Sequence, residues 1–161
     1  LDKTNRQPDG RIATDIYESK LKKLKIRTRR AGAHNITTKV IDSTKVLKKM
    51  KDTADRVLID APCSGIGVLK RNPDSKWKLQ PEFVENIIKT QAEILENYSK
   101  LVKVGGKLVY ATCSILPSEN ENQVKAFLKN NANFTILKDR KVSPFKTGYD
   151  GFYMALLERN S

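Results

Sequence analysis

The sequence predicts an α/β domain with a doubly wound, mostly parallel sheet and an antiparallel last strand. Two patterns support this fold class. Apolar, β-branched runs alternate with segments of helical spacing along nearly the whole chain, which is typical of a parallel sheet covered by helices. The last two strand candidates follow each other too closely for a helical crossover, so we expect them to pair antiparallel. A chain of 161 residues is long enough to bury a core.

The first sixty residues carry the opening part of this alternation. Apolar residues at helical spacing, such as Leu21 and Leu24, define the first helix, and Asp42 with Ser43 can cap the second. The expected elements are a strand over 11–15, a helix over 17–31, a strand over 36–41, a short helix to about 50 and a strand over 55–60.

The second part begins with a long loop over 61–79, of a length that is usually functional or disordered. Pro81 opens a long helix that we expect to end at Gly105-Gly106, and Ser118 with Glu121 forms a capping box for a later helix. The remaining expectations are strands over 107–111, 134–137 and 152–157 and a helix to about 130.

Charge and composition indicate which class of binding partner the chain has. The formal net charge is +13, which favours an anionic partner such as nucleic acid, although a solvated surface has the same signature. The chain has neither an apolar stretch of about 20 residues nor a signal-peptide pattern, so we expect no membrane span. Two cysteines without a secretion signal suggest reduced thiols in the cytoplasm. The start at Leu1, in a polar stretch over 1–10, suggests a loop remnant of something longer.

Both cysteines directly follow strand candidates. Cys63 stands in Asp60-Ala-Pro-Cys-Ser-Gly, and Cys113 stands in Ala-Thr-Cys-Ser. Functional groups gather at the carboxyl ends of parallel strands, so two thiols there form a candidate nucleophilic site. A disulfide, or one cysteine that is merely a small buried apolar residue, is the alternative. Spacing alone does not decide which thiol attacks.

An ordered series of motifs carries a resemblance that runs from about Arg11 to Glu158. It resembles the Sun/Fmu (RsmB-type) family of RNA 5-methylcytosine methyltransferases. The resemblance implies a Rossmann-type catalytic domain, S-adenosylmethionine as cofactor, RNA (ribosomal RNA above all) as substrate, and no metal. The motifs are Asp-Ala-Pro-Cys-Ser-Gly at 60–65, Arg-Asn-Pro-Asp-Ser-Lys-Trp at 71–77, Thr-Cys-Ser at 112–114 and Asp-Gly-Phe at 150–152.

The chemistry of that family explains why these residue types are needed. Carbon 5 of cytosine is a poor nucleophile until a thiolate adds at carbon 6, which is covalent catalysis. An acid such as Asp60 supports protonation at ring nitrogen 3. The resemblance assigns the attack to Cys113 and help with release of the adduct to Cys63.

The resemblance also assigns a cofactor side. Asp15 follows the first strand, where an acid can accept hydrogen bonds from a ribose diol. Asp42 matches the acid that contacts adenine, and Asp60 lies at the cofactor edge. The local alternative is that these residues act only in turns and caps.

Substrate contacts are expected in the long loop. Cations and a stacking surface are what single-stranded RNA binding requires. Trp77 is either that surface or a packing anchor for its loop, and His34 has no assigned role. Asp150-Gly151-Phe152 either lines the pocket or begins the last strand. The candidate substrate-binding residues are Lys70, Arg71, Asn72 and Lys76.

One part of the family pattern is absent. No glycine-rich cofactor loop precedes Asp15, and residues 1–10 are too short to supply that loop and the central first strand, so we expect a split sheet with exposed edges. Two hypotheses follow: the chain is the C-terminal, catalytic part of a methyltransferase, or the fragment alone is a non-catalytic RNA-binding or dimerising body whose gap another chain closes. Amino-group methylation is the rival enzyme class, but Cys63 stands where those sites carry a second proline.

Overall fold

The computed structural model describes residues 10–161, and its contacts divide the chain into two compact units. The first unit extends to Lys49 and the second is Met50–Ser161. The expectation that residues 1–10 are a loop remnant falls, except for Gly10, outside the described residues. That the whole chain forms one catalytic domain stays a prediction.

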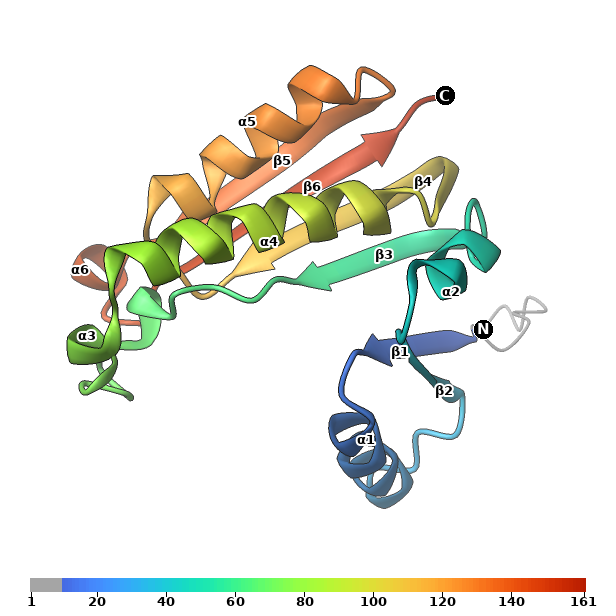
Figure 1. The fold of residues 1–161 in the computed structure, drawn as a ribbon, viewed down its shortest axis with the longest axis horizontal. Coiled ribbons are helices and arrows are strands. Elements are labelled where there is room, and N and C mark those ends of the chain that lie inside the picture. Colours follow the sequence, from blue (N-terminus) through green and yellow to red (C-terminus); the bar gives the residue numbers. More distant parts are fainter. Residues whose placement is uncertain (1–9) are drawn as a thin grey trace, which may run out of the picture. The chain divides into compact units, whose positions relative to one another are not determined.

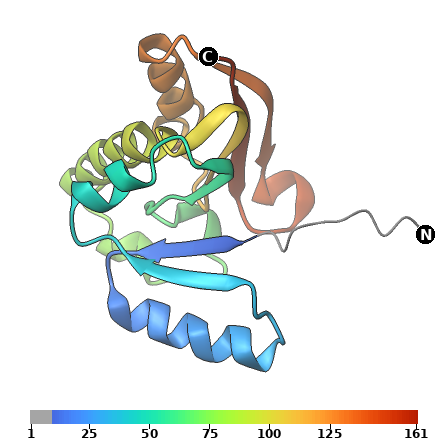
Figure 2. The same ribbon diagram turned by 90° about the vertical axis from the view of Figure 1, so that its right-hand side faces the viewer.

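The first unit is a strand–helix–strand–helix segment. Strands β1 (Arg11–Asp15) and β2 (Ile36–Val40) pair in parallel, with Asp15 opposite Val40. Helix α1 (Glu18–Arg30) lies along this pair, as Figure 2 shows, and buries Leu21. Helix α2 (Thr44–Lys49) follows β2. All four elements agree with the sequence prediction.

The second unit has a four-stranded sheet of order β3-β4-β6-β5 (Figure 1). Strands β3 (Ala54–Asp60) and β4 (Val102–Thr112) are parallel, whereas β6 (Phe152–Arg159) is antiparallel to both β4 and β5 (Phe134–Val142). The mixed sheet with an antiparallel last strand is therefore confirmed.

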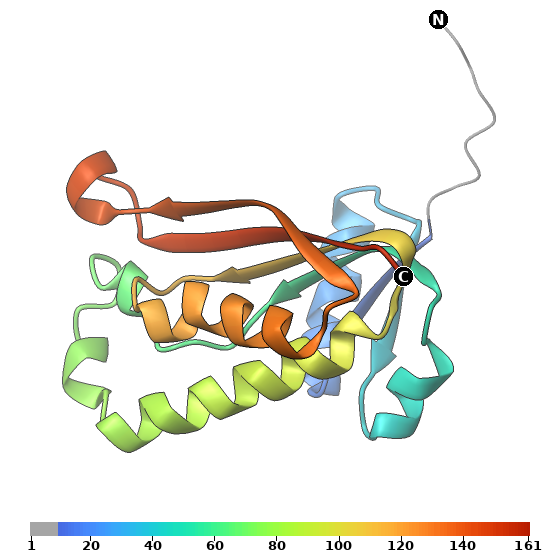
Figure 3. The same ribbon diagram turned by 90° about the horizontal axis from the view of Figure 1, so that it is seen from above.

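Both long helices of this unit cover one face of its sheet, as Figure 3 shows from above. They are α4 (Pro81–Ser99) and α5 (Glu121–Asn130). Leu95, Phe127 and Leu157 are among the side chains buried between helices and sheet. Burial of such side chains contributes roughly 1.5–3 kcal/mol each to stability, which is why these elements hold together.

Two sequence predictions are wrong in detail. Helix α4 ends at Ser99 rather than at Gly105, because the β-branched Val102 and Val104 already belong to β4 and Gly105 has a left-handed φ of 76° within that strand. Ser118 does not cap α5. It lies in a 3₁₀ turn (η2, Pro117–Glu119), and Asn120 is the N-cap residue, without a side-chain cap hydrogen bond.

The long loop 61–79 is more ordered than expected. It holds a 3₁₀ turn (η1, Ile66–Val68) and the short helix α3 (Ser75–Lys78). A further short helix, α6 (Pro144–Thr147), connects β5 to β6.

Among the described residues the strands form two separate sheets, and no strand joins them. Strand β3 is consequently an edge of its sheet, and Leu58 on it is 71% exposed. This agrees with the split expected from the sequence. No helix among the described residues is long and apolar enough to cross a membrane.

Candidate active site

The two cysteine loops meet at the carboxyl ends of β3 and β4. These strands are parallel neighbours with Asp60 opposite Ala111, so the residues that follow each strand emerge at the same edge. The Sγ atoms of Cys63 and Cys113 lie 3.2 Å apart, and both thiols are free and partly buried. The pair is thus in hydrogen-bond contact and is not a disulfide.

The two thiols are not equivalent. A hydrogen bond donated by the Cys63 thiol lowers the pKa of Cys113 to about 7, although burial and the negative charges of Asp60 and Glu119 oppose this change. The same hydrogen bond, followed by burial, raises the pKa of Cys63. The thiolate is the reactive form of cysteine, and Cys113 is the thiol of the pair whose pKa favours that form.

A buried carboxylate lies beneath the cysteine pair and bonds to both loops. Glu119 is fully buried, and it accepts hydrogen bonds from the backbone N–H of Ser64 (2.7 Å) and from the hydroxyl of Ser64 (2.5 Å). The hydroxyl of Ser114 donates to the same carboxylate. Because Ser64 follows Cys63 and Ser114 follows Cys113, one side chain holds both cysteine loops.

Further polar groups complete this network. Gln91 on α4 donates from Nε2 to the carbonyl of Pro62 (2.8 Å) and to Glu119 (3.2 Å), and it accepts a hydrogen bond from Gln123 (3.3 Å). The Tyr110 hydroxyl donates to the backbone carbonyl of Glu119 (2.8 Å). A buried carboxylate needs such donors to offset the cost of removing it from water.

Two glycines let a third loop pack on the cysteine loops. The N–H of Gly67 donates to the carbonyl of Cys113 (3.0 Å), and the N–H of Gly151 donates to the carbonyl of Gly67 (2.7 Å). A Cβ atom built on Gly67 would collide with the Gly151 carbonyl and would lie 2.6 Å from that of Cys113. Only glycine permits this approach.

The predicted substrate residues lie on the exposed loop that follows Cys63. Lys70, Arg71, Asn72 and Lys76 are all exposed. The Arg71 guanidinium forms an ion pair with Asp150 (Nε–Oδ2, 2.7 Å), which connects this loop to the start of β6.

Trp77 lies on the same loop and is 76% exposed, with the Lys76 ammonium 4.7 Å from its ring centroid. This exposure argues against a packing anchor.

The predicted cofactor acids are divided between the two units. Asp60, at the end of β3, is exposed and close enough to Cys113 to affect its pKa. Asp15 ends β1, where it accepts the Tyr17 N–H (2.8 Å) and pairs with Lys20 (3.5 Å). Asp42 follows the neighbouring parallel strand and accepts the Ser43 hydroxyl (3.1 Å). Two carboxylates after adjacent parallel strands fit the hydroxyl-rich half of a nucleoside.

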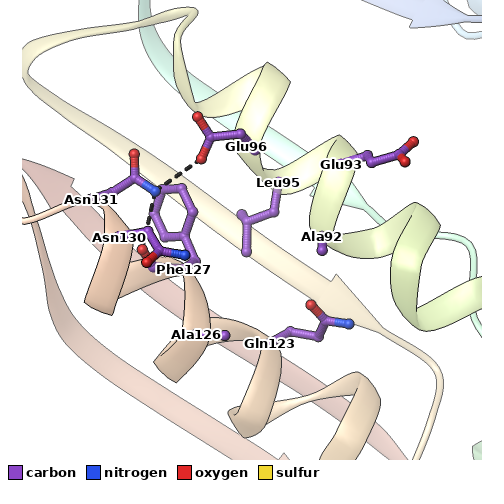
Figure 4. Close-up of a pocket in the computed structure, with 9 residues that line it drawn as sticks. All are labelled: Ala92, Glu93, Leu95, Glu96, Gln123, Ala126, Phe127, Asn130 and Asn131. Atoms are coloured by element: carbon purple, nitrogen blue, oxygen red, sulfur yellow. Dashed lines mark hydrogen bonds between the residues drawn. The ribbon is translucent and has the colours of Figure 1, made fainter.

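One cavity of the second unit lies away from the cysteines. It has a volume of about 300 Å³ and is a groove between α4 and α5, bordered by Leu95 and Phe127 and bridged by the hydrogen bond from Asn131 to Glu96 (3.0 Å), as Figure 4 shows. Its lining residues include no thiol. A smaller hollow of about 200 Å³, lined by Ser64, Ser75, Leu79 and Phe83, adjoins the Cys63 loop.

Sequence reasoning missed the residues beneath the cysteines. Gln91 carried a signal, because this polar residue occurs at helical spacing with Ile87 and Leu95 on an otherwise apolar stripe. Glu119 carried no such signal in the sequence, since its hydrogen-bond partner Ser64 is 55 residues away in the chain.

Comparison with known proteins assigns the chain that carries this site to a family. The chain matches the family described as 16S rRNA methyltransferase RsmB/F over residues 5–158. It belongs to this family. The Sun/Fmu resemblance is thereby confirmed, and both cysteine motifs lie within the matched region.

Curated relatives of this RsmB/F chain are methyltransferases in name. The ribosomal RNA small subunit methyltransferase B of Photorhabdus laumondii is 36% identical over an alignment of 156 positions, which covers 92% of this chain and 36% of the relative. That of Vibrio cholerae is 35% identical over an alignment of 164 positions, which covers 96% of this chain and 37% of the relative. The chain therefore spans little more than a third of the length of these relatives.

Solved structures agree with the RsmB/F fold. The structure titled PH0851 is 32% identical, with a TM-score of 0.88 over 94% of this chain and 38% of that one. NSun6 from Pyrococcus horikoshii, solved with SFG, is 25% identical, with a TM-score of 0.80 over 93% of this chain and 41% of that one. The fold is that of Rossmann-type S-adenosylmethionine-dependent methyltransferases.

Proposed function

We propose that this RsmB/F chain is the catalytic part of an RNA cytosine-5 methyltransferase that acts on ribosomal RNA. The observation that carries the proposal is the contact of 3.2 Å between Cys63 and Cys113 at the ends of two parallel strands, beside Asp60. A pair of thiols in which one donates to the other suits a reaction that needs one thiolate and one proton-holding partner. The family supplies the substrate class.

The proposed reaction begins with the Cys113 thiolate. Its sulfur adds to carbon 6 of cytosine, and the electron pair of the 5,6 double bond moves toward carbon 5, while Asp60 stabilises the proton taken up at ring nitrogen 3. Attack by carbon 5 requires the base to leave its stack, so unpaired or flipped nucleotides are the expected substrates.

S-adenosylmethionine supplies the methyl group when bound. Asp15 and Asp42 would hold its ribose and adenine, and Asp60 would border it, because carboxylates after parallel strands accept hydroxyl and amino donors. The chain's remaining tasks are to hold the base and to move protons.

Release completes the cycle. Solvent water takes the proton at nitrogen 3 and the carbon 5 proton, and the electron pair of the C5–H bond re-forms the 5,6 double bond. The bond between carbon 6 and sulfur breaks, and the electron pair of that bond leaves on Cys113 as thiolate. Cys63 assists this step, since its S–H can donate again to the departing sulfur at the distance in the free site. None of these steps uses a metal ion.

Identification of the methylated nucleoside tests the proposal. The protein is incubated with methyl-labelled S-adenosylmethionine and 16S ribosomal RNA, and the digested RNA is separated into nucleosides. We expect label in 5-methylcytidine. Label in an amino-methylated adenosine would overturn the proposal in favour of the rival enzyme class.

The alternative of a non-catalytic RNA-binding or dimerising body is favoured by the split sheet. Calorimetric titration with S-adenosylmethionine separates the two. A dissociation constant below millimolar supports catalysis by this chain, whereas RNA retention without cofactor binding or label transfer supports the alternative.

A further inference from the structure

Three aromatic side chains near the cysteine end of the sheet are exposed without a packing role. Trp77 is 76% exposed, Phe145 is 94% exposed and Tyr149 is 77% exposed. Aromatic rings usually supply much of a protein's buried area, so leaving three in water forgoes that stabilisation. We call these three residues the aromatic rim.

The rim is presented by hydrogen-bonded turns. The N–H of Lys146 donates to the Ser143 carbonyl (3.1 Å), and Gly148, with a left-handed φ of 71°, ends α6 by donating to the Pro144 carbonyl (3.0 Å). The N–H of Tyr149 donates to the Thr147 hydroxyl (3.3 Å). Phe145 and Tyr149 therefore project from a defined scaffold, which lowers the entropy cost of binding a flat ligand.

Backbone contacts connect this scaffold to the nucleophile. Gly151, two residues after Tyr149, donates to Gly67, which in turn donates to Cys113. The Arg71–Asp150 ion pair joins the scaffold to the loop that carries Trp77. Figures 1 and 3 place α3 and α6 beyond the end of the sheet at which β3 and β4 finish.

The charges around the rim suit an anionic partner. The rings are accompanied by three exposed lysines, Lys70, Lys76 and Lys146. Two carboxylates oppose this positive charge: Asp150 is already paired with Arg71, and Asp74 is exposed. Aromatic rings interleaved with cations are the arrangement that binds single-stranded nucleic acid, because bases stack on the rings and phosphates contact the cations.

We propose that the aromatic rim is a stacking surface for unpaired nucleotides that flank the reacting cytosine, with Phe145 and Tyr149 as its principal platforms. This inference rests on the proposed function for its substrate and adds a place at which that substrate is held. The principal platforms, Phe145 and Tyr149, lie on the β5–β6 connection, outside the loop that carries Trp77 and in which RNA contacts were predicted.

Binding of a labelled, unstructured single-stranded RNA tests the rim, with substitutions at the most exposed ring. Phe145→Ala and Phe145→Leu should each weaken binding about fivefold or more, because stacking contributes roughly 1–3 kcal/mol per base, whereas Phe145→Trp should retain it. Val104→Ala, at another exposed apolar position (62%) near the start of β4, is the control and should change binding less than twofold. Melting temperatures should stay unchanged, since Phe145 is almost fully exposed.

The salt dependence of RNA affinity distinguishes the contribution of ring stacking from that of phosphate contacts. Lys146→Ala should reduce the slope of log affinity against log salt by about 0.7, the value for one phosphate contact on a single strand, while Phe145→Ala should leave the slope unchanged. Wild-type affinity in Phe145→Leu would overturn the proposal, as would equal weakening in Val104→Ala. Sedimentation showing a wild-type dimer that Phe145→Ala abolishes would assign the rim to a second copy and also overturn it.

Different results would contradict the stacking surface and the proposed reaction. If 5-methylcytidine forms normally and Phe145→Ala binds RNA like wild type, only the rim is wrong. If stacking is lost in Phe145→Ala but no 5-methylcytidine forms with wild type, only the reaction is wrong.

Discussion

Glu119 accepts two hydrogen bonds from Ser64, one from its backbone N–H at 2.7 Å and one from its hydroxyl at 2.5 Å. Ser114 donates to the same carboxylate from the other cysteine loop. One carboxylate therefore holds the two cysteine loops together. Because Glu119 joins the two loops that carry the thiols, we expect a change at Glu119 to disturb the chemistry.

Glu119→Gln is the first prediction. The amide of the new side chain would place a donor among groups that all donate, and an unsatisfied buried donor costs about 1–3 kcal/mol. We expect the free energy of unfolding, measured in urea, to fall by this amount. Glu93→Gln, at an exposed position on α4, is the control and should change it by less than about 0.5 kcal/mol. Equal stability of the two variants would contradict the network.

The pH dependence of thiol alkylation is the second prediction. The pKa of Cys113 is lowered to about 7 by the Cys63 hydrogen bond, so under reducing conditions its reaction with iodoacetamide should rise with pH and be half-maximal near pH 7. In Cys63→Ala the donor is lost, and the midpoint should move up toward the ordinary value of about 8.5.

Cys113→Ala provides the complementary measurement. The remaining thiol, Cys63, is partly buried and has lost its partner, and burial raises its pKa, so alkylation should need a pH above about 8.5. A midpoint near pH 7 in Cys113→Ala would reverse the roles of the two cysteines.

Gly67→Ala is the third prediction. A Cβ at this position collides with backbone atoms of Gly151 and Cys113, which cannot rotate away, so the three loops must separate. Overpacking of this kind costs about 1–3 kcal/mol, and we expect both a lower melting temperature and slower alkylation of Cys113. Gly10→Ala is the matched control, because nothing lies within 4 Å of its added Cβ. Unchanged Cys113 reactivity in Gly67→Ala would show that the glycine contact does not position the nucleophile.

Local pattern accounts for most of the fold that could be predicted. Alternating β-branched and helical segments placed the strands, and the proximity of β5 and β6 in sequence indicated their antiparallel pairing. The end of α4 was missed because Leu101 and Val102 continue its apolar spacing, while the pairing of Val102 with Ala54 makes it a strand residue. Tertiary pairing overrides local periodicity at such boundaries.

In the candidate site, too, the residues that follow a local sequence pattern could be predicted, and those that depend on tertiary packing could not. Cys63, Cys113 and Asp60 could be found because each lies at or just after the end of a strand, and parallel neighbours bring such positions together. Glu119 and the Gly67–Gly151 contact could not be found, because they depend on how separate loops pack against one another. Phe145 and Tyr149 could not be found either, since exposure of a ring is a property of the folded surface.

The central claim is that Cys113 attacks and Cys63 assists release, and trapping of the covalent adduct tests it most directly. RNA carrying 5-fluorocytosine lacks the carbon 5 proton that must leave, so incubation with the protein and S-adenosylmethionine should give a protein–RNA adduct that survives a denaturing gel. We predict adduct with wild type and with Cys63→Ala, and none with Cys113→Ala. Adduct formed by Cys113→Ala, or its loss only in Cys63→Ala, would contradict the account.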